Sequence, residues 1–318
     1  MRRPGKSLGP CIAALLLAAS ALPVHAAATT WKAIASMPKS RAYMAATEGL
    51  NSDVYAFGGK EVGSLADLTD VYNPTTRKWS TLPAAPGIGA NPAAATGPAG
   101  KIYAIGSGVY DGSECWDTSA TVDALSTKTN TWVTQAPLPD ARGAVAAVSG
   151  PGGFIYALGG ATSDCGQADS TNEVDRFNPN TDSWGIGVPM LTQRDSFAAV
   201  VGTDGRIYAI GGEDYGTSLS SVEAFSSNTN SWSYVASLPT ASTVYGAALG
   251  KDGRIYVMDG TAFEAYSIAT NSWATLPAPP GSNPYGFGPM VAVGSSHSVL
   301  DVVNAGNYKA AATYTYAT

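Results

Sequence analysis

The chain has 318 residues, 45% of them hydrophobic, and a formal net charge of −6 at pH 7. Nucleic acid is a poor partner for such a chain, because acidic surfaces repel the phosphate backbone. After the N-terminal segment, no apolar run approaches the roughly 20 residues that a membrane-spanning helix needs. We therefore expect a mature chain without a membrane span, of a length that suits one large domain or two small ones.

The first 26 residues have the three-part layout of a secretory signal peptide. Three basic residues precede an apolar run from Cys11 to Ala21, and Val24-His25-Ala26 places small residues before a cleavage point. The apolar run is too short for the alternative, a transmembrane anchor. We predict a signal peptide over residues 1–26, a mature chain of residues 27–318, and a secreted or periplasmic location.

The mature chain repeats a nine-residue pattern at intervals of roughly 50 residues, as repeat architectures do. The copies are NSDVYAFGG (51–59), AGKIYAIGS (99–107), GGFIYALGG (152–160), DGRIYAIGG (204–212) and DGRIYVMDG (252–260), with a divergent sixth at 296–307. The Asp-Gly pairs at 204–205 and 252–253 predict two-residue hairpins in which both turn residues have positive φ. The apolar run before the glycines predicts a strand that is buried on both faces.

Each copy has the same neighbours in the chain. A short β-prone run follows the glycines, then a Thr/Asn-rich turn and a tryptophan (Trp79, Trp132, Trp184, Trp232 and Trp273), then an Ala/Val-rich run that leads into the next copy. Four short strands per unit, without sustained helical periodicity, predict a β-propeller.

The sixth unit ends one strand short at Thr318, whereas an extra tryptophan strand surrounds Trp31 at the other end. We predict an all-β fold, a six-bladed propeller with four antiparallel strands per blade over residues 27–318. The N-terminal strand around Trp31 completes the last blade and closes the ring, which removes open strand edges.

The glycine pairs, the strands written VYNP and DRFNP, and the spaced tryptophans resemble the kelch motif over nearly all of residues 30–318. The pattern departs from the motif at Gly106-Ser107, Asp259-Gly260 and Ala305-Gly306. The resemblance implies a secreted, six-bladed kelch protein of bacterial type. It also implies that the repeat tryptophans and the five repeat tyrosines pack between blades: Tyr55, Tyr103, Tyr156, Tyr208 and Tyr256.

Binding residues of a rigid ring are expected on the loops of one face. In kelch-like chains two segments reach that face: the start of the innermost strand and the loop after the glycine pair. The first segment offers candidate ligand contacts in several units: Arg41, Tyr43, Arg142, Arg194, Asp195, Tyr245 and Tyr285. Arginine forks match carboxylates, although the arginines could equally hold blade ends together through backbone carbonyls.

The loops after the glycine pairs differ from unit to unit. Trp116 is the one tryptophan outside the repeat, and it is a candidate stacking platform for a sugar or peptide or, alternatively, a side chain packed on its neighbour. Cys115 and Cys165 occupy corresponding loops of adjacent units, so export predicts a disulfide between them rather than two free thiols.

The sequence offers little catalytic chemistry. The mature chain holds a single histidine, His297, so we expect no metal site and no cofactor. The first interpretation is an exported monomeric binding protein for a glycan or peptide. One alternative rests on resemblance to the N-acetylneuraminate mutarotase family, with Glu213 or Tyr245 moving the proton and the arginines holding the carboxylate. The other alternative is a scaffold for protein interactions alone.

Overall fold

The computed structural model describes residues 31–39, 41–61, 64–65, 68–110, 116–162, 169–244, 246–258, 262–278, 290–293, 298–305 and 310–317. These residues form antiparallel strands arranged in a ring, with two short 3-10 turns, η1 (Pro98–Gly100) and η2 (Pro151–Gly153). The predicted signal peptide lies outside the described residues. In the part of the chain that the structure describes, no helix is long and apolar enough to cross a membrane.

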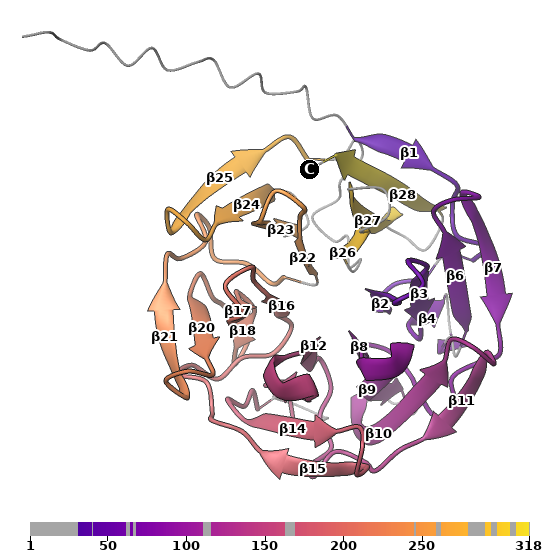
Figure 1. Ribbon diagram of the computed structural model, residues 1–318, viewed down its shortest axis with the longest axis horizontal. Coiled ribbons are helices and arrows are strands. Elements are labelled where there is room, and N and C mark those ends of the chain that lie inside the picture. Colours follow the sequence, from indigo (N-terminus) through magenta and orange to yellow (C-terminus); the bar gives the residue numbers. More distant parts are fainter. Residues whose placement is uncertain are drawn as a thin grey trace, which may run out of the picture.

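Five four-stranded sheets follow one another along the chain, and we number them blades 1 to 5 (Figure 1). Blade 1 contains β2 (Ala45–Glu48), β3 (Val54–Phe57), β6 (Thr69–Asn73) and β7 (Lys78–Leu82); blade 2 contains β8 (Ala93–Thr96), β9 (Lys101–Tyr110), β10 (Trp116–Ser126) and β11 (Thr131–Thr134). Blade 3 contains β12 (Ala146–Ser149), β13 (Ile155–Leu158), β14 (Val174–Asn178) and β15 (Ser183–Ile186). Blade 4 contains β16 (Ala198–Val201), β17 (Ile207–Ile210), β20 (Val222–Ser226) and β21 (Ser231–Val235); blade 5 contains β22 (Ala247–Leu249), β23 (Arg254–Met258), β24 (Phe263–Ser267) and β25 (Ser272–Leu276).

A further four-stranded sheet joins the two ends of the chain, and we call it the closing sheet. It contains β26 (Met290–Val293), β27 (Ser298–Ala305) and β28 (Ala310–Ala317), with β1 (Lys32–Ile34) as its outer strand. Lys32 of β1 pairs with Thr315 of β28, in antiparallel register. The propeller class predicted from the sequence is confirmed. The count of six equivalent blades stays a prediction, because the side chains of β26 to β28 lie outside the described residues.

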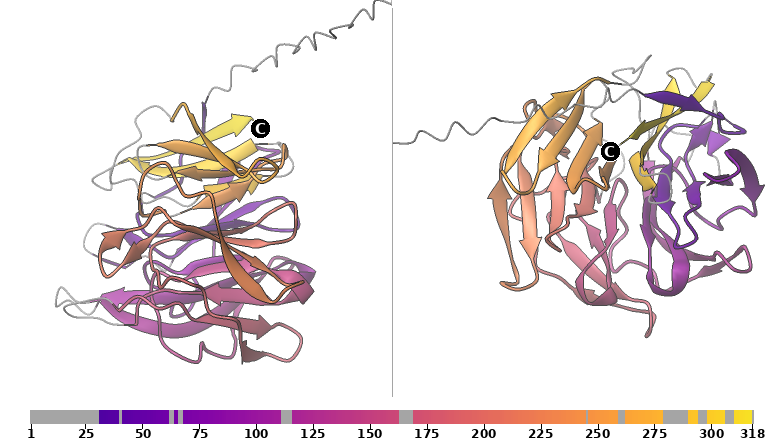
Figure 2. Two further views of the ribbon diagram at one scale, coloured as in Figure 1. Left: turned by 90° about the vertical axis from the view of Figure 1, so that its left-hand side faces the viewer. Right: turned by 45° about the horizontal axis from the view of Figure 1, so that its top comes forward.

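Burial differs between the strands of a blade according to their distance from the centre of the ring. The second strand is buried on both faces, as in Ile207–Ile210 of β17, whereas the outermost strand is mostly exposed, as in β15, where only Trp184 is half-buried. Neighbouring blades therefore sandwich each second strand, and the outermost strands face solvent, as Figure 2 shows from the side. Continuous apolar runs are typical of strands covered on both faces.

The repeat aromatics lie between the blades, as the kelch resemblance implies. All five repeat tyrosines are buried, and Tyr103 packs edge-on against Phe177 of the next blade, with ring centroids 5.6 Å apart. Six tryptophans each donate the indole N–H to a backbone carbonyl in the connection from the preceding blade. Trp31 follows the same rule, donating to Pro277 O at 2.7 Å, which makes β1 equivalent to the outermost strand of the other blades.

The Asp-Gly turns differ from the prediction in one respect. Gly205 and Gly253 have φ of +76° and +81°, but neither aspartate has positive φ. Each aspartate instead accepts a hydrogen bond from the backbone N–H two residues later, that of Arg206 or Arg254. The side chain thus stabilises a turn with one left-handed residue, which aspartate favours because its carboxylate reaches its own backbone.

Candidate functional site

The two segments predicted to reach one face of the ring do meet there, and we call it the loop face. In blades 1 to 4 the residue three positions before the inner strand pairs with the residue that follows the glycine-pair position, as Ala42 pairs with Lys60 and Asp195 with Glu213. The glycine pairs link this face from blade to blade. Gly59 N donates to Gly89 O, Gly160 N to Arg194 O and Gly212 N to Ser242 O. The loop face is therefore tied to a rigid frame of backbone hydrogen bonds.

A partial ring of left-handed residues, one before the inner strand of each of blades 1 to 4, lies at the mouth of the central channel on the loop face. Tyr43, Asn91, Ala144 and Ser196 occupy equivalent positions and have φ between +51° and +56°. Asn91 N donates to Tyr43 O, Ser196 N to Ala144 O and Val244 N to Ser196 O. A left-handed non-glycine backbone costs free energy and persists only where surrounding contacts hold it, so this ring fixes the shape of the mouth.

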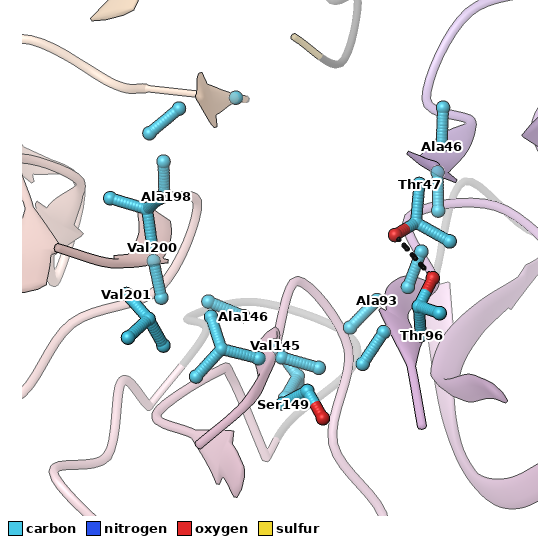
Figure 3. A pocket seen from close by; sticks show the side chains of 18 of the residues that line it. Ala46, Thr47, Ala93, Thr96, Val145, Ala146, Ser149, Ala198, Val200 and Val201 are labelled. Carbon is cyan, nitrogen blue, oxygen red and sulfur yellow. Dashed lines mark hydrogen bonds between the residues drawn. The ribbon is translucent and has the colours of Figure 1, made fainter. Parts of the chain in front are cut away.

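The channel has a volume of about 350 Å³, and its lining combines apolar side chains with polar ones such as Thr47, Glu48 and Thr96. Five half-buried alanines from equivalent positions of the inner strands line it: Ala46, Ala94, Ala147, Ala199 and Ala247. Figure 3 shows Thr47 and Thr96 hydrogen-bonded across two inner strands on one side, with Val200 and Val201 opposite. Apart from Glu48, the described residues that line the channel carry no titratable side chain.

The three arginines are fully buried inside blades rather than gathered at the channel mouth. Arg41 donates to Leu68 O at 2.7 Å and to Asp70 Oδ2 at 2.8 Å. Arg142 donates to Gly159 O and pairs with Asp175. These contacts match the structural alternative, in which the arginines tie blade ends together through backbone carbonyls.

Arg194 makes the fullest set of such contacts. Its guanidinium donates to Gly211 O, Ser221 O and Glu223 Oε1, the last at 2.7 Å, and both partners of the ion pair are 0% exposed. Burial lowers the pKa of Arg194, and the charge of Glu223 opposes that shift. A guanidinium that is enclosed inside a blade and paired with Glu223 cannot present its fork to a dissolved carboxylate, so we leave the arginines out of the proposed site.

The predicted residues Asp195 and Glu213 lie side by side where blades 3 and 4 meet the loop face. Asp195 N donates to Glu213 O, and Glu213 N donates to Asp195 O. Burial, together with the negative charge of Asp195, raises the pKa of Glu213. Ser170 Oγ donates to Asp195 Oδ2 at 2.6 Å and accepts from Tyr215 N. We call Ser170, Asp195, Glu213, Asp214 and Tyr215 the acidic corner.

A short hairpin carries three residues of the acidic corner: Glu213, Asp214 and Tyr215. Its strands are β18 (Glu213–Asp214) and β19 (Thr217–Ser218), and its turn is formed by Tyr215 and Gly216, with φ of +47° and +73°. Tyr215 is 55% exposed at the tip. Blade 1 has a corresponding hairpin of β4 (Lys60–Glu61) and β5 (Ser64–Leu65).

Sequence reasoning did not single out Ser170, Asp214 or Tyr215. The signal was the turn-forming segment DYGT in the loop after the blade 4 glycines, since tyrosine and glycine at a turn point to an exposed aromatic. Ser170 gave no comparable signal, because its partner Asp195 is 25 residues away in the chain.

The remaining predicted residues are placed only in part. Tyr43 lies half-buried at the channel mouth. Trp116 is the first residue of β10, and its side chain lies outside the described residues. Tyr245, Tyr285, Cys115 and Cys165 also lie outside them, so their predicted roles and the disulfide stay predictions. Among the described residues, no group of three or more His, Cys, Asp or Glu side chains is arranged to hold a metal ion.

Comparison with known proteins agrees with this fold. The kelch motif matches residues 41–86 and 196–239, which contain blades 1 and 4. Kelch-like protein 35 from Mus musculus is 28% identical over 194 residues, which are 60% of this chain and 31% of the mouse protein. The Homo sapiens protein of the same name is 27% identical over 167 residues, covering 51% of this chain and 26% of that protein. The chain thus spans less than a third of these curated relatives.

The solved structure of YjhT superposes with a TM-score of 0.72 at 15% identity, covering 89% of this chain and 96% of that one. A likeness at that identity concerns the fold alone. The matched motif, the relatives and the structural neighbour agree with the glycine pairs and spaced tryptophans of the sequence. Together these findings support a kelch-repeat β-propeller.

Proposed function

We propose that this protein is an exported, non-catalytic binding protein that recognises a polypeptide at the acidic corner of its loop face. The observation that carries the proposal is Tyr215, an exposed aromatic held at positive φ on a hairpin beside the carboxylates of Asp195 and Glu213. A strained, solvent-facing residue on a rigid frame is typical of a binding site. The expected ligand is a basic segment, because lysine or arginine side chains complement the carboxylates and stack on tyrosine.

A glycan is the second candidate, and the same residues favour it. Exposed tyrosine offers an apolar face to a sugar ring, and neighbouring carboxylates accept hydrogen bonds from hydroxyl groups. The mutarotase alternative has less support, because the arginines on which it relied are committed to internal ion pairs. The scaffold alternative resembles the first proposal, because both bind a polypeptide. The two differ only in whether the partner is a short segment or a whole protein.

The test is a binding screen of the purified protein against a basic peptide library and a glycan array. We expect Tyr215→Ala and Glu213→Gln each to weaken binding about tenfold, in keeping with a central aromatic anchor and a rim charge. Tyr234→Ala is the matched control, because Tyr234 is 58% exposed but lies on the outermost strand of blade 4. Binding that survives both loop-face changes would show that the acidic corner is not the site.

Export is proposed from the layout of residues 1–26. Intact mass of the protein recovered from the periplasm or medium of an expressing cell should correspond to a chain that begins at Ala27. The same sample should lose the mass of two hydrogens through a bond between Cys115 and Cys165 and regain it with reductant. A chain that keeps residues 1–26 would rule out the predicted cleavage.

A further inference from the structure

A second pocket lies between blades 3 and 4, at the outer rim of the ring and away from the channel. Its volume is about 200 Å³, and its lining includes Val174, Arg176, Phe225 and Trp232. Arg176 belongs to β14 of blade 3, and the two aromatic residues belong to β20 and β21 of blade 4. The pocket is thus an opening in an interface between blades.

The sister blades show why this interface is open. Arg176 follows the buried acidic residue of the third strand, Asp175. The equivalent residues of the other four blades are small, apolar and buried: Val71, Ala124, Ala224 and Ala265. Blade 3 alone among these blades has a long cationic side chain at this position, and a guanidinium cannot be enclosed as alanine is without large desolvation cost.

The residue paired with Arg176 on the neighbouring strand is also unusually small. Arg176 pairs with Gly185 of β15, whereas the equivalent partners in the other blades carry side chains: Ser80, Val133, Ser233 and Ala274. A Cβ atom built on Gly185 would meet nothing within 4 Å. At this pair of positions, blade 3 therefore has the largest residue on the third strand and the smallest on the fourth strand.

The charge of Arg176 is not compensated by an ion pair among the described residues. Its Nη2 donates to Ile186 O at 3.3 Å, and its Cζ lies 5.5 Å from the centroid of the Phe154 ring. Arg41, Arg142 and Arg194, by contrast, each pair with a carboxylate. A guanidinium has five N–H donors in a planar fork, so Arg176 keeps donors for an acceptor that enters the pocket.

We propose that the pocket between blades 3 and 4 is a second ligand site, which takes a small carboxylate with an apolar body. The carboxylate binds the guanidinium of Arg176, since planar two-point pairing is the geometry that arginine favours. The apolar body lies against Phe225 and Trp232, which are 5% and 7% exposed. A cavity of roughly 150 Å³ accommodates benzene, so this pocket suits an aromatic ring that carries one carboxylate.

The experiment is calorimetric titration of the full protein with benzoate and with benzamide, its neutral counterpart of similar shape. We expect benzoate to bind in the millimolar range and benzamide about tenfold more weakly, because only the carboxylate pairs with arginine. Arg176→Ala should reduce benzoate binding to the level of benzamide. The melting temperature should stay within a few degrees, since alanine is the residue of three sister blades.

Two further variants separate the pocket from general charge effects. Gly185→Val installs the residue of blade 2 directly beside Arg176 and should weaken benzoate binding by crowding the guanidinium, while the arginine remains. Arg77→Ala removes one positive charge from an exposed turn and should leave binding unchanged. The proposal is overturned if benzoate does not bind at millimolar concentration, if benzamide binds equally well, or if Arg176→Ala binds benzoate like the unaltered protein.

Discussion

At the scale of single residues, each blade buries an acidic side chain in its third strand, and the blades differ in how they compensate its charge. Asp70, Asp175 and Glu223 pair with arginines of blades 1, 3 and 4. In blade 2 the position of the arginine is taken by Gly89, and Asp123 is 0% exposed with a single described hydrogen bond, from Thr134. The buried carboxylate of the third strand is therefore paired with an arginine in blades 1, 3 and 4, whereas in blade 2 no described arginine compensates its charge.

The paired carboxylates lead to the first prediction. Arg194→Ala should lower the free energy of unfolding by about 3–5 kcal/mol, because it leaves Glu223 charged and buried without its partner. Urea denaturation followed by circular dichroism measures this loss. Arg206→Ala is the control, since its ion pair with Asp204 is about 30% exposed and should contribute less than about 1 kcal/mol. Equal losses in the two variants would contradict the structural role of Arg194.

The unpaired carboxylate leads to the second prediction, which depends on pH. Burial raises the pKa of Asp123, so the folded chain keeps this proton to higher pH than the unfolded chain. The favourable contribution of protonated Asp123 to the stability of the fold is present below the unfolded pKa of about 3.9. This contribution is lost as pH rises through the folded pKa. Asp123→Asn keeps the acceptor for Thr134 and should stabilise the protein at pH 7 by on the order of 1–3 kcal/mol, the cost of an unsatisfied buried group.

Melting temperatures measured from pH 3 to pH 8 test the second prediction. The gain of Asp123→Asn should disappear near the acid end, where both forms are neutral. Asp70→Asn is the matched control and should have the opposite effect at pH 7, because it removes the negative charge that pairs with buried Arg41. A gain that does not vary with pH would exclude titration of Asp123 as its cause.

At the scale of elements, the glycine pair determines how a blade joins the next one. Gly212 has φ of +98°, and a Cβ atom there would lie 2.5 Å from Asp195 O. The pair also donates across blades, from Gly212 N to Ser242 O. Backbone conformation and close approach of a neighbouring carbonyl both require glycine at this position.

The third prediction compares two glycines of blade 4. Gly212→Ala should destabilise the protein by more than 2 kcal/mol, because the strain of a left-handed alanine, about 1–2 kcal/mol, adds to the collision with Asp195 O. Gly205→Ala has similar strain at φ of +76° but nothing within 4 Å of its Cβ atom, so its loss should be the smaller one. Thermal unfolding of the two variants measures the difference, and a larger loss in Gly205→Ala would contradict this explanation.

At the scale of the whole molecule, the repeat was enough to predict the propeller, because strand length, turn chemistry and burial recur with it in every blade. The positions of the arginines were also readable from the sequence, but their partners were not. Arg142 and Asp175 are 33 residues apart, and only the folded blade brings them together. The pocket at Arg176 was missed for a related reason, since its lining combines residues of blade 3 with Phe225 and Trp232 of the next blade.

The last prediction concerns how the two ends of the chain hold the ring together. Trp31, just before β1, donates to Pro277 O and packs edge-on against Phe263 of blade 5, with ring centroids 4.8 Å apart. Its strand also covers the outer edge of β28. Deleting residues 27–36 would expose that edge and remove the aromatic contact, so the protein should melt at a lower temperature and aggregate more readily.

A single substitution separates the contribution of the Trp31 side chain from the effect of deleting the whole segment. Trp31→Ala keeps β1 but loses the indole contacts, and should lower the free energy of unfolding by roughly 2–3 kcal/mol, less than a fully buried tryptophan because Trp31 is half-buried. Trp31→Phe should lose less, since the ring on Phe263 is retained. If the deletion leaves the melting temperature unchanged, β1 does not close the ring, and the propeller is stable with β28 as an open edge.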